Sequence, residues 1–180
     1  MRRIRRLLAF FAKRTVAAAM IALLLVSSFY IAMNTASIWV IVDDGMEARA
    51  RTVICGEDAR QLARYFTEDF IRQDPVLQVG LGEASPYRDY SVRSISHKVH
   101  FDSIWAWPWE NVARAEILEE VPSIDGSILP SVREAAIAAG GEERAKPPAW
   151  NSARYRVTLM RNRGRWVISS LQQMTETRSR

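Results

Sequence analysis

The chain has 180 residues, which is enough for one ordinary globular domain and a membrane anchor but not for two full domains. Its net charge is +5, yet six basic side chains and no acidic one precede residue 15, so the rest of the chain carries a net charge of −1. A nearly neutral domain lacks the basic surface that neutralises phosphates, which excludes nucleic acid as its expected partner. The single cysteine, Cys55, excludes an intramolecular disulfide and a thiolate metal cluster and leaves only an intermolecular bridge open.

Residues 1–14 form a short basic tail, and residues 15–42 contain no charged side chain. The most apolar part, 16–33, has about the length that a helix needs to cross a hydrocarbon core about 30 Å thick. Basic residues flank this segment on its N-terminal side only, which predicts a cytoplasmic N-terminus and an extracytoplasmic domain at 43–180. The sequence therefore predicts an integral, single-pass protein of the cell membrane.

Both the anchor and the tail have an alternative interpretation. A cleavable signal peptide also has a basic segment followed by an apolar one, but its apolar run is usually shorter, and Asn34-Thr35-Ala36 is a poor cleavage site. These features favour an uncleaved anchor, and both interpretations export the domain. The tail is sufficiently explained as a topology signal; its alternative role is docking to anionic lipid or to a cytoplasmic partner.

Apolar residues between positions 45 and 74 recur at steps of three and four, which predicts helices that bury one face. An interruption at Cys55-Gly56 divides the segment into a membrane-proximal helix and a second helix that begins near Glu57 and Asp58. Pro75 ends the second helix, because the residue before a proline is driven away from helical angles. The apolar residues of this pattern are Met46, Ala50, Val53, Ile54, Leu62, Tyr65, Phe66 and Phe70.

The pattern changes to a period of two at residues 91–107, which predicts a strand with one buried face. This stretch is longer than an ordinary strand, so a bend or bulge is expected near Asp102 and Ser103. The large apolar residues occupy odd positions, at Ile95, Val99, Phe101, Trp105 and Trp107.

Three further segments complete the predicted domain. A second strand is expected at 111–121, with faces that are less cleanly separated. Residues 122–150 are rich in glycine and proline and are expected to form a long connection that contains a short helix at 131–139. A hairpin is expected at 154–171, where Gly164 permits the positive φ of the turn.

This hairpin reads Tyr-x-Val-x-Leu from Tyr155, a turn, and Gly-x-Trp-x-Ile from Gly164. Helices followed by a long bent strand and such a hairpin resemble the cone-shaped domain of the nuclear transport factor two-like superfamily, over residues 45–174. The resemblance implies an α+β fold in which helices pack on a curved antiparallel sheet. With one anchor and a short tail, the chain is similar to membrane-anchored assembly proteins of type IV secretion and conjugation systems. That likeness implies a non-enzymatic scaffold that self-associates and contacts other envelope or membrane proteins.

The sequence contains no signature of catalysis. The only histidines, His97 and His100, are three apart on a predicted strand and point to opposite faces, so they cannot easily share a metal ion. No nucleophile elbow and no phosphate-binding glycine pattern occurs in the sequence. His97 shares the apolar face and is expected to be packed and hydrogen-bonded, although near Asp102 or a glutamate it would be able to act as an acid or base.

The prediction is therefore a protein that is not an enzyme, with no catalytic residue, metal or cofactor. One alternative is a small-ligand-binding or enzymatic cone domain, which needs polar groups around His97 in an apolar cavity. Another alternative is an envelope sensor that signals through its basic tail.

Two groups of side chains have competing interpretations. Trp105, Trp107 and Trp109 would share one face of a straight strand, where we expect core residues in preference to a stacking platform for sugars, bases or a partner. Five arginines within twelve residues form a candidate interaction surface for acidic protein, nucleic acid or lipid headgroups, or else a solvated face that prevents aggregation. They are Arg154, Arg156, Arg161, Arg163 and Arg165.

Overall fold

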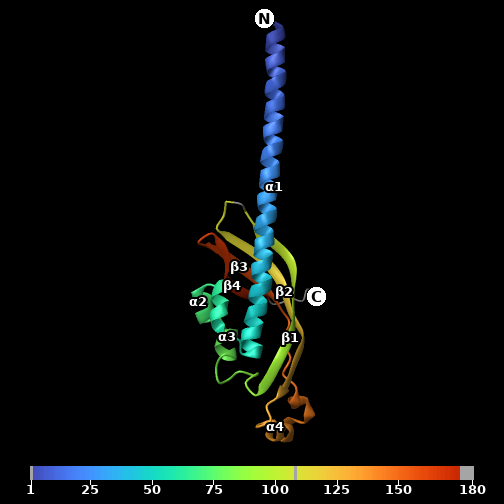
Figure 1. The fold of residues 1–180 in the computed structure, drawn as a ribbon, viewed down its shortest axis with the longest axis vertical. Helices are drawn as coiled ribbons and strands as arrows, with labels where there is room; N and C mark the ends of the chain where they lie inside the picture. Colours follow the sequence, from blue (N-terminus) through green and yellow to red (C-terminus); the bar gives the residue numbers. More distant parts are fainter. Residues whose placement is uncertain (1, 108, 175–180) are drawn as a thin grey trace, which may run out of the picture.

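The computed structural model describes residues 2–107 and 109–174, and of residues 2–12, 139 and 140 only the backbone. One long helix, α1 (Arg2–Cys55), leads into an α+β domain built on a four-stranded antiparallel sheet (Figure 1). This confirms the predicted α+β class. The side chains of the basic tail before Lys13, and residues 175–180 of the predicted domain, lie outside the described part of the chain.

Helix α1 continues without a break from an exposed apolar half into the core of the domain (Figure 1). Between Lys13 and Cys55 it is, among the described residues, the one helix long and apolar enough to cross a membrane. Its side chains at 16–33 are exposed, whereas Ile38 and Val42 are completely buried. The predicted membrane-proximal helix is thus the end of α1 itself, and the last residues of the predicted 15–42 segment belong to the domain core.

The second predicted helix is replaced by three short helices, which are η1 (Ala59–Arg64), α2 (Glu68–Gln73) and α3 (Pro75–Gly80). Their ends are set by residues whose side chains accept hydrogen bonds from helix N-termini. Asp58 caps η1 and Thr67 caps α2, while Asp74 both ends α2 and caps α3. The predicted start near Asp58 and the predicted end before Pro75 are confirmed; the internal cap at Thr67 was missed.

The sheet has the strand order β1-β2-β3-β4, with β1 (Tyr90–Ala106), β2 (Val112–Ile128), β3 (Ala153–Asn162) and β4 (Arg165–Met174). The hairpin of β3 and β4 and the short helix α4 (Arg133–Gly140) confirm their predictions.

The prediction that a connection begins at Pro122 is wrong, because β2 continues through this residue to Ile128. Beyond Glu119 the strand pairs with β1 alone, and Pro122 lies at a shift in that pairing. A proline is tolerated at such an edge or bulge because its missing N–H interrupts no ladder. Composition alone therefore underestimated the length of β2.

The bulge predicted near Asp102 is confirmed by a register shift between Phe101 and Ser103. One extra residue moves every following side chain to the opposite face of a strand. Ile104 therefore turns towards the core, and the tryptophans beyond it turn outward. The prediction that these tryptophans are core residues is wrong, since the exposed fractions are 60% for Trp105, 40% for Trp107 and 75% for Trp109.

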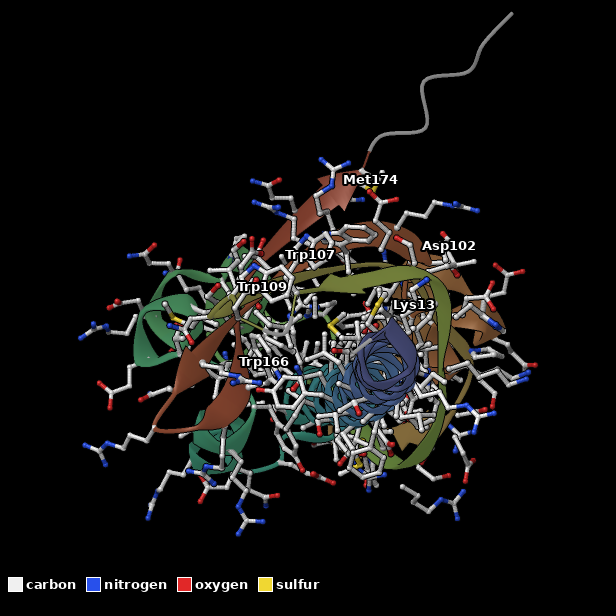
Figure 2. The ribbon with its side chains drawn as sticks, turned by 90° about the horizontal axis from the view of Figure 1, so that it is seen from above. Lys13, Asp102, Trp107, Trp109, Trp166 and Met174 are labelled. Atoms are coloured by element: carbon white, nitrogen blue, oxygen red, sulfur yellow. The ribbon has the colours of Figure 1, made fainter. Side chains whose placement is uncertain are left out.

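Seen along α1, the sheet curves around the helix, while the short helices lie towards one side (Figure 2). Trp39 of α1 packs against Phe101 of β1 with ring centroids 5.7 Å apart. The core between helix and sheet is formed by α1 side chains and by the inward side chains of the strands. Its completely buried members include Ile38, Val42, Met46, Val157, Leu159 and Ile168.

Gly80, at the end of α3, allows this short helix to approach α1 closely. A Cβ atom at this position would lie 2.6 Å from Cγ1 and 2.8 Å from Cγ2 of Val53. We expect Gly80→Ala to lower the free energy of unfolding by about 1–3 kcal/mol, because the branched valine cannot turn away. Urea unfolding of the full chain in detergent measures this loss. Val53→Ala in the same chain should make Gly80→Ala nearly neutral, and an unchanged penalty would contradict the close approach.

Candidate functional site

Four ionisable side chains from different parts of the chain meet inside the domain. Arg49 of α1 donates from Nε to Oδ2 of Asp74 at 2.7 Å and from Nη2 to Oδ1 at 3.2 Å. His97 of β1 and Glu119 of β2 form a second pair, with Nε2 and Oε1 3.1 Å apart. Nη1 of Arg49 lies 3.9 Å from Oε2 of Glu119 and joins the two pairs. These four residues are called the buried polar cluster below.

The local pattern of each element accounts for the position of these side chains. Arg49 lies one turn from Met46 and Val53, on the face of α1 that is packed in the core. Glu119 lies two residues after Ile117 on β2, so both side chains point to the inner face of the sheet. His97 lies inside and is hydrogen-bonded, as predicted, and its partner is a glutamate brought in by folding. Arg49, Asp74 and Glu119 were not predicted as members of a site. The signal that could have identified Arg49 is its charge within the apolar helical repeat of α1.

The buried polar cluster is shielded from solvent. All four side chains are at most 5% exposed. Burial would lower the pKa of Arg49, but the hydrogen bonds and charge of Asp74, together with Glu119, hold this pKa above its ordinary value. Burial also raises the pKa of Tyr155, whose ring lies 6.0 Å from the Arg49 guanidinium carbon, although that cation opposes the rise. Arg49 therefore stays charged and serves as the counter-ion of two buried carboxylates.

A mainly apolar cleft of about 490 Å³ lies next to the buried polar cluster. Val76, Tyr87, Trp150 and Tyr155 are among its lining residues. Trp150 separates the cleft from the cluster, since it also donates from Nε1 to Oε2 of Glu119 at 3.4 Å. A second cleft of about 470 Å³ adjoins the first at Tyr87. The described lining of both clefts includes none of the four cluster residues, so the charged groups are not presented to a ligand there.

The structure brings no metal ligands together within its described part. No group of three or more histidine, cysteine, aspartate or glutamate side chains is placed there to hold a metal ion. His97 and His100 have opposite surroundings, as expected: the side chain of His97 is 2% exposed and that of His100 is 60% exposed. His100 lies 3.4 Å from the carboxylate of Glu120 at the surface. The arrangement therefore offers a buried ion-pair network with no open coordination site among these residues.

The five arginines of the candidate interaction surface have three different surroundings. Arg154 and Arg156 alternate with the buried residues of β3 and lie on the outer face of the sheet. Arg154 donates to Asp102 at 2.9 Å, and Arg156 donates to Glu116 at 2.9 and 3.1 Å. Arg156 therefore connects the neighbouring strands β3 and β2, whereas Arg154 reaches across β2 to β1.

Arg161 lies on the inner side of the β3–β4 hairpin and binds α1. Its guanidinium donates to the hydroxyl of Tyr30 at 3.2 Å and to Oδ1 of Asn34 at 2.7 Å. The same group lies 4.8 Å from the centroid of the Trp166 ring, a cation–π contact. Arg161 therefore links the β3–β4 hairpin to α1 at the point where this helix enters the domain.

Arg163 and Arg165 are exposed and flank the turn between β3 and β4. Arg163 has a φ of 50° and Gly164 a φ of 82°, so the predicted use of glycine with positive φ in this turn is confirmed. These two arginines lie at the same end of the domain as the Arg161 contact with α1 (Figure 1).

The Arg161 contact can be tested by its contribution to stability. We expect Arg161→Ala to lower the free energy of unfolding by about 2 kcal/mol, because charge-assisted hydrogen bonds to Tyr30 and Asn34 are lost. The matched control is Arg165→Ala at an exposed site, with an expected change within about 0.5 kcal/mol. Urea unfolding in detergent distinguishes the two, and equal effects would show that the contact is not stabilising.

The fold and the site define an α+β protein carried on one long helix that is able to anchor it in a membrane. No model of a protein family matches the chain, and no curated protein matches it significantly.

Proposed function

We propose that this is a single-pass membrane protein whose extracytoplasmic domain is a non-enzymatic scaffold of an envelope-spanning apparatus, such as a conjugative transfer or secretion system. The observation that carries the proposal is the continuity of α1, which is apolar and exposed over residues 16–33 and then forms the domain core. A domain folded around the end of its own anchor cannot swing on a linker. It is held at a fixed height and orientation beside its neighbours, as an assembly component requires.

The same helix supports an uncleaved anchor. Cleavage after Ala36 would remove Tyr30 and Asn34 from their hydrogen bonds with Arg161, and would cut a helix that is unbroken as far as Cys55. The basic tail before the apolar segment favours a cytoplasmic N-terminus, which leaves the domain on the opposite side of the membrane.

The interior of the domain favours a scaffold over an enzyme. A curved sheet around a helix, with short helices at its side, is compatible with the nuclear transport factor two-like cone, and this likeness is part of the proposal. The space within the curve is filled by α1, and the ionisable side chains of the buried polar cluster are paired with each other and shielded from solvent. Such a network stabilises one arrangement of the elements more readily than it binds a substrate.

The test uses the full chain in its native membranes. We expect it to remain in the membrane fraction and to form reproducible cross-links, through its domain, with further copies of itself or with other envelope proteins. The matched control carries a flexible glycine–serine insertion between Met33 and Asn34, which keeps the anchor and the domain but uncouples them. The control should lose the defined cross-links. A wild-type chain that stays monomeric without neighbours, or that fractionates with soluble proteins, would refute the proposal.

The apolar cleft favours a second candidate, binding of a small and mainly apolar ligand. Its volume of about 490 Å³ lies in the range of small-molecule sites. Val79→Trp should fill the cleft from α3, at an exposed lining residue outside the buried polar cluster. A compound that raises the melting temperature of the wild type but not of this variant would support the candidate. Equal shifts in both proteins, or none, would count against it.

A further inference from the structure

We propose that the domain makes a second contact with the membrane, separate from the spanning helix. A rim of exposed aromatic, apolar and basic side chains, here called the membrane rim, inserts into the headgroup layer of the leaflet from which α1 emerges. The inference rests on the proposed membrane anchoring. The rim consists of Trp105, Trp107, Trp109, Met160, Arg163 and Arg165.

The three tryptophans form a continuous cluster outside the core. Trp105 and Trp107 meet edge to face with ring centroids 5.4 Å apart, and Trp107 and Trp109 stack at 5.0 Å. Figure 2, which looks along α1 onto this end of the domain, shows Trp107 and Trp109 side by side. Exposed contiguous aromatic surface of this kind marks an interaction site. Tryptophan in particular is enriched where a membrane meets water, because its ring is apolar and its N–H is polar.

Hydrogen bonds establish the height of the rim along α1. The backbone N–H of Arg161 donates to the carbonyl of Asn111, in the turn between β1 and β2, at 2.9 Å. The side chain of the same arginine binds Tyr30 and Asn34. The turn that carries Trp109 is therefore level with the part of α1 where its exposed apolar half meets the domain. Figure 1 shows both hairpin turns at this end, and α4 at the opposite end.

The length of the exposed helix places the membrane boundary at the same level. Residues 16–33 are exposed and apolar, and about 1.5 Å per residue gives them a length of about 27 Å. This is close to the thickness of a hydrocarbon core of about 30 Å. If Lys13 and Arg14 lie at the cytoplasmic boundary, the other boundary coincides with Tyr30 to Asn34 and thus with the rim.

The chemistry of the rim fits an anionic phospholipid surface. Met160 is 42% exposed and pairs across the sheet with Val112, which is 41% exposed, so apolar surface extends from the tryptophans onto β3. Arg163 and Arg165 add two exposed cations, and Glu110 is an exposed acid within the β1–β2 turn. Guanidinium groups bind phosphate, while the rings occupy the boundary with the acyl chains. The bilayer is the favoured partner of the membrane rim because the rim lies level with the membrane boundary. A protein partner would have to fit between the rim and the membrane.

Spin-label accessibility in the full chain tests the proposal. In a Cys55→Ser background, single labels are attached at Leu24→Cys in the exposed half of α1, at Glu110→Cys in the β1–β2 turn next to Trp109, and at Glu142→Cys beside α4. The protein is reconstituted into phosphatidylcholine vesicles that contain phosphatidylglycerol. We expect the ratio of oxygen to nickel-complex accessibility at position 110 to be several-fold that at position 142, and lower than at position 24.

The outcomes separate this inference from the proposed anchoring. If the label at position 24 lies in hydrocarbon but the label at position 110 is as accessible to water as the label at position 142, the membrane rim is overturned. The proposed anchoring then remains intact. An aqueous label at 24 would overturn both. Replacement of Trp105, Trp107 and Trp109 by serine should move the label at 110 into water, and no movement would overturn the role of the rings. Far-UV circular dichroism verifies that the triple variant folds. If it does not fold, the double variant Trp107→Ser with Trp109→Ser is the milder replacement for the same test.

Discussion

Replacement of Arg49 by methionine is expected to lower the free energy of unfolding by about 3–5 kcal/mol, the largest effect of any single change considered for this domain. Methionine fills similar space in the core, but it leaves the carboxylates of Asp74 and Glu119 buried without their counter-ion. Urea unfolding of the full chain in detergent, followed by tryptophan fluorescence, measures the loss.

The matched control for this change is Arg51→Met, two residues further along the same helix. Arg51 pairs with Glu47 at 3.3 Å and with Glu57 at 2.8 Å, but its side chain is 36% exposed. Solvent screens these pairs, so we expect a loss below about 1 kcal/mol. If Arg49→Met were tolerated as well as Arg51→Met but impaired the proposed assembly, the buried polar cluster would be a functional site.

Ile38→Ala is expected to lower the free energy of unfolding by about 2–5 kcal/mol, because it leaves a cavity in a core that α1 shares with the sheet. The control is Ile31→Ala, two turns earlier, where the side chain is 44% exposed. In detergent this control should change stability by no more than about 0.5 kcal/mol. Equal effects at the two positions would show that the domain does not fold around the end of α1.

The Arg49→Met and Ile38→Ala experiments test whether the contacts that stabilise the domain are also those that couple it rigidly to α1. The buried polar cluster joins α1 to β1, β2 and the segment between α2 and α3, while Ile38 and Arg161 connect α1 to the sheet near its entry. Both sets of contacts hold the domain on the long helix α1, which is able to cross a membrane. Loss of either should therefore reduce the rigid coupling between membrane and domain before any surface contact is altered.

The amino-acid sequence by itself determined the features that depend on local pattern. The apolar run before residue 34, the bulge near Asp102, the helix end before Pro75 and the turn at Gly164 follow from charge, period and backbone preference, and the structure contains each of them. Such features depend on neighbours within a few positions, which the sequence displays directly. The α+β class followed from the change of period along the chain.

Only the tertiary structure decided which faces are buried and which distant residues meet. The bulge near Asp102 reverses the side on which Trp105 lies, so tryptophans expected in the core form the membrane rim. An apolar residue such as Ile38 has the same local pattern whether lipid or a sheet covers it. Arg49 and Glu119 are 70 positions apart and become partners because α1 lies within the curve of the sheet. Burial is a property of elements in contact, and it is the packing of α1 against the sheet that determined it here.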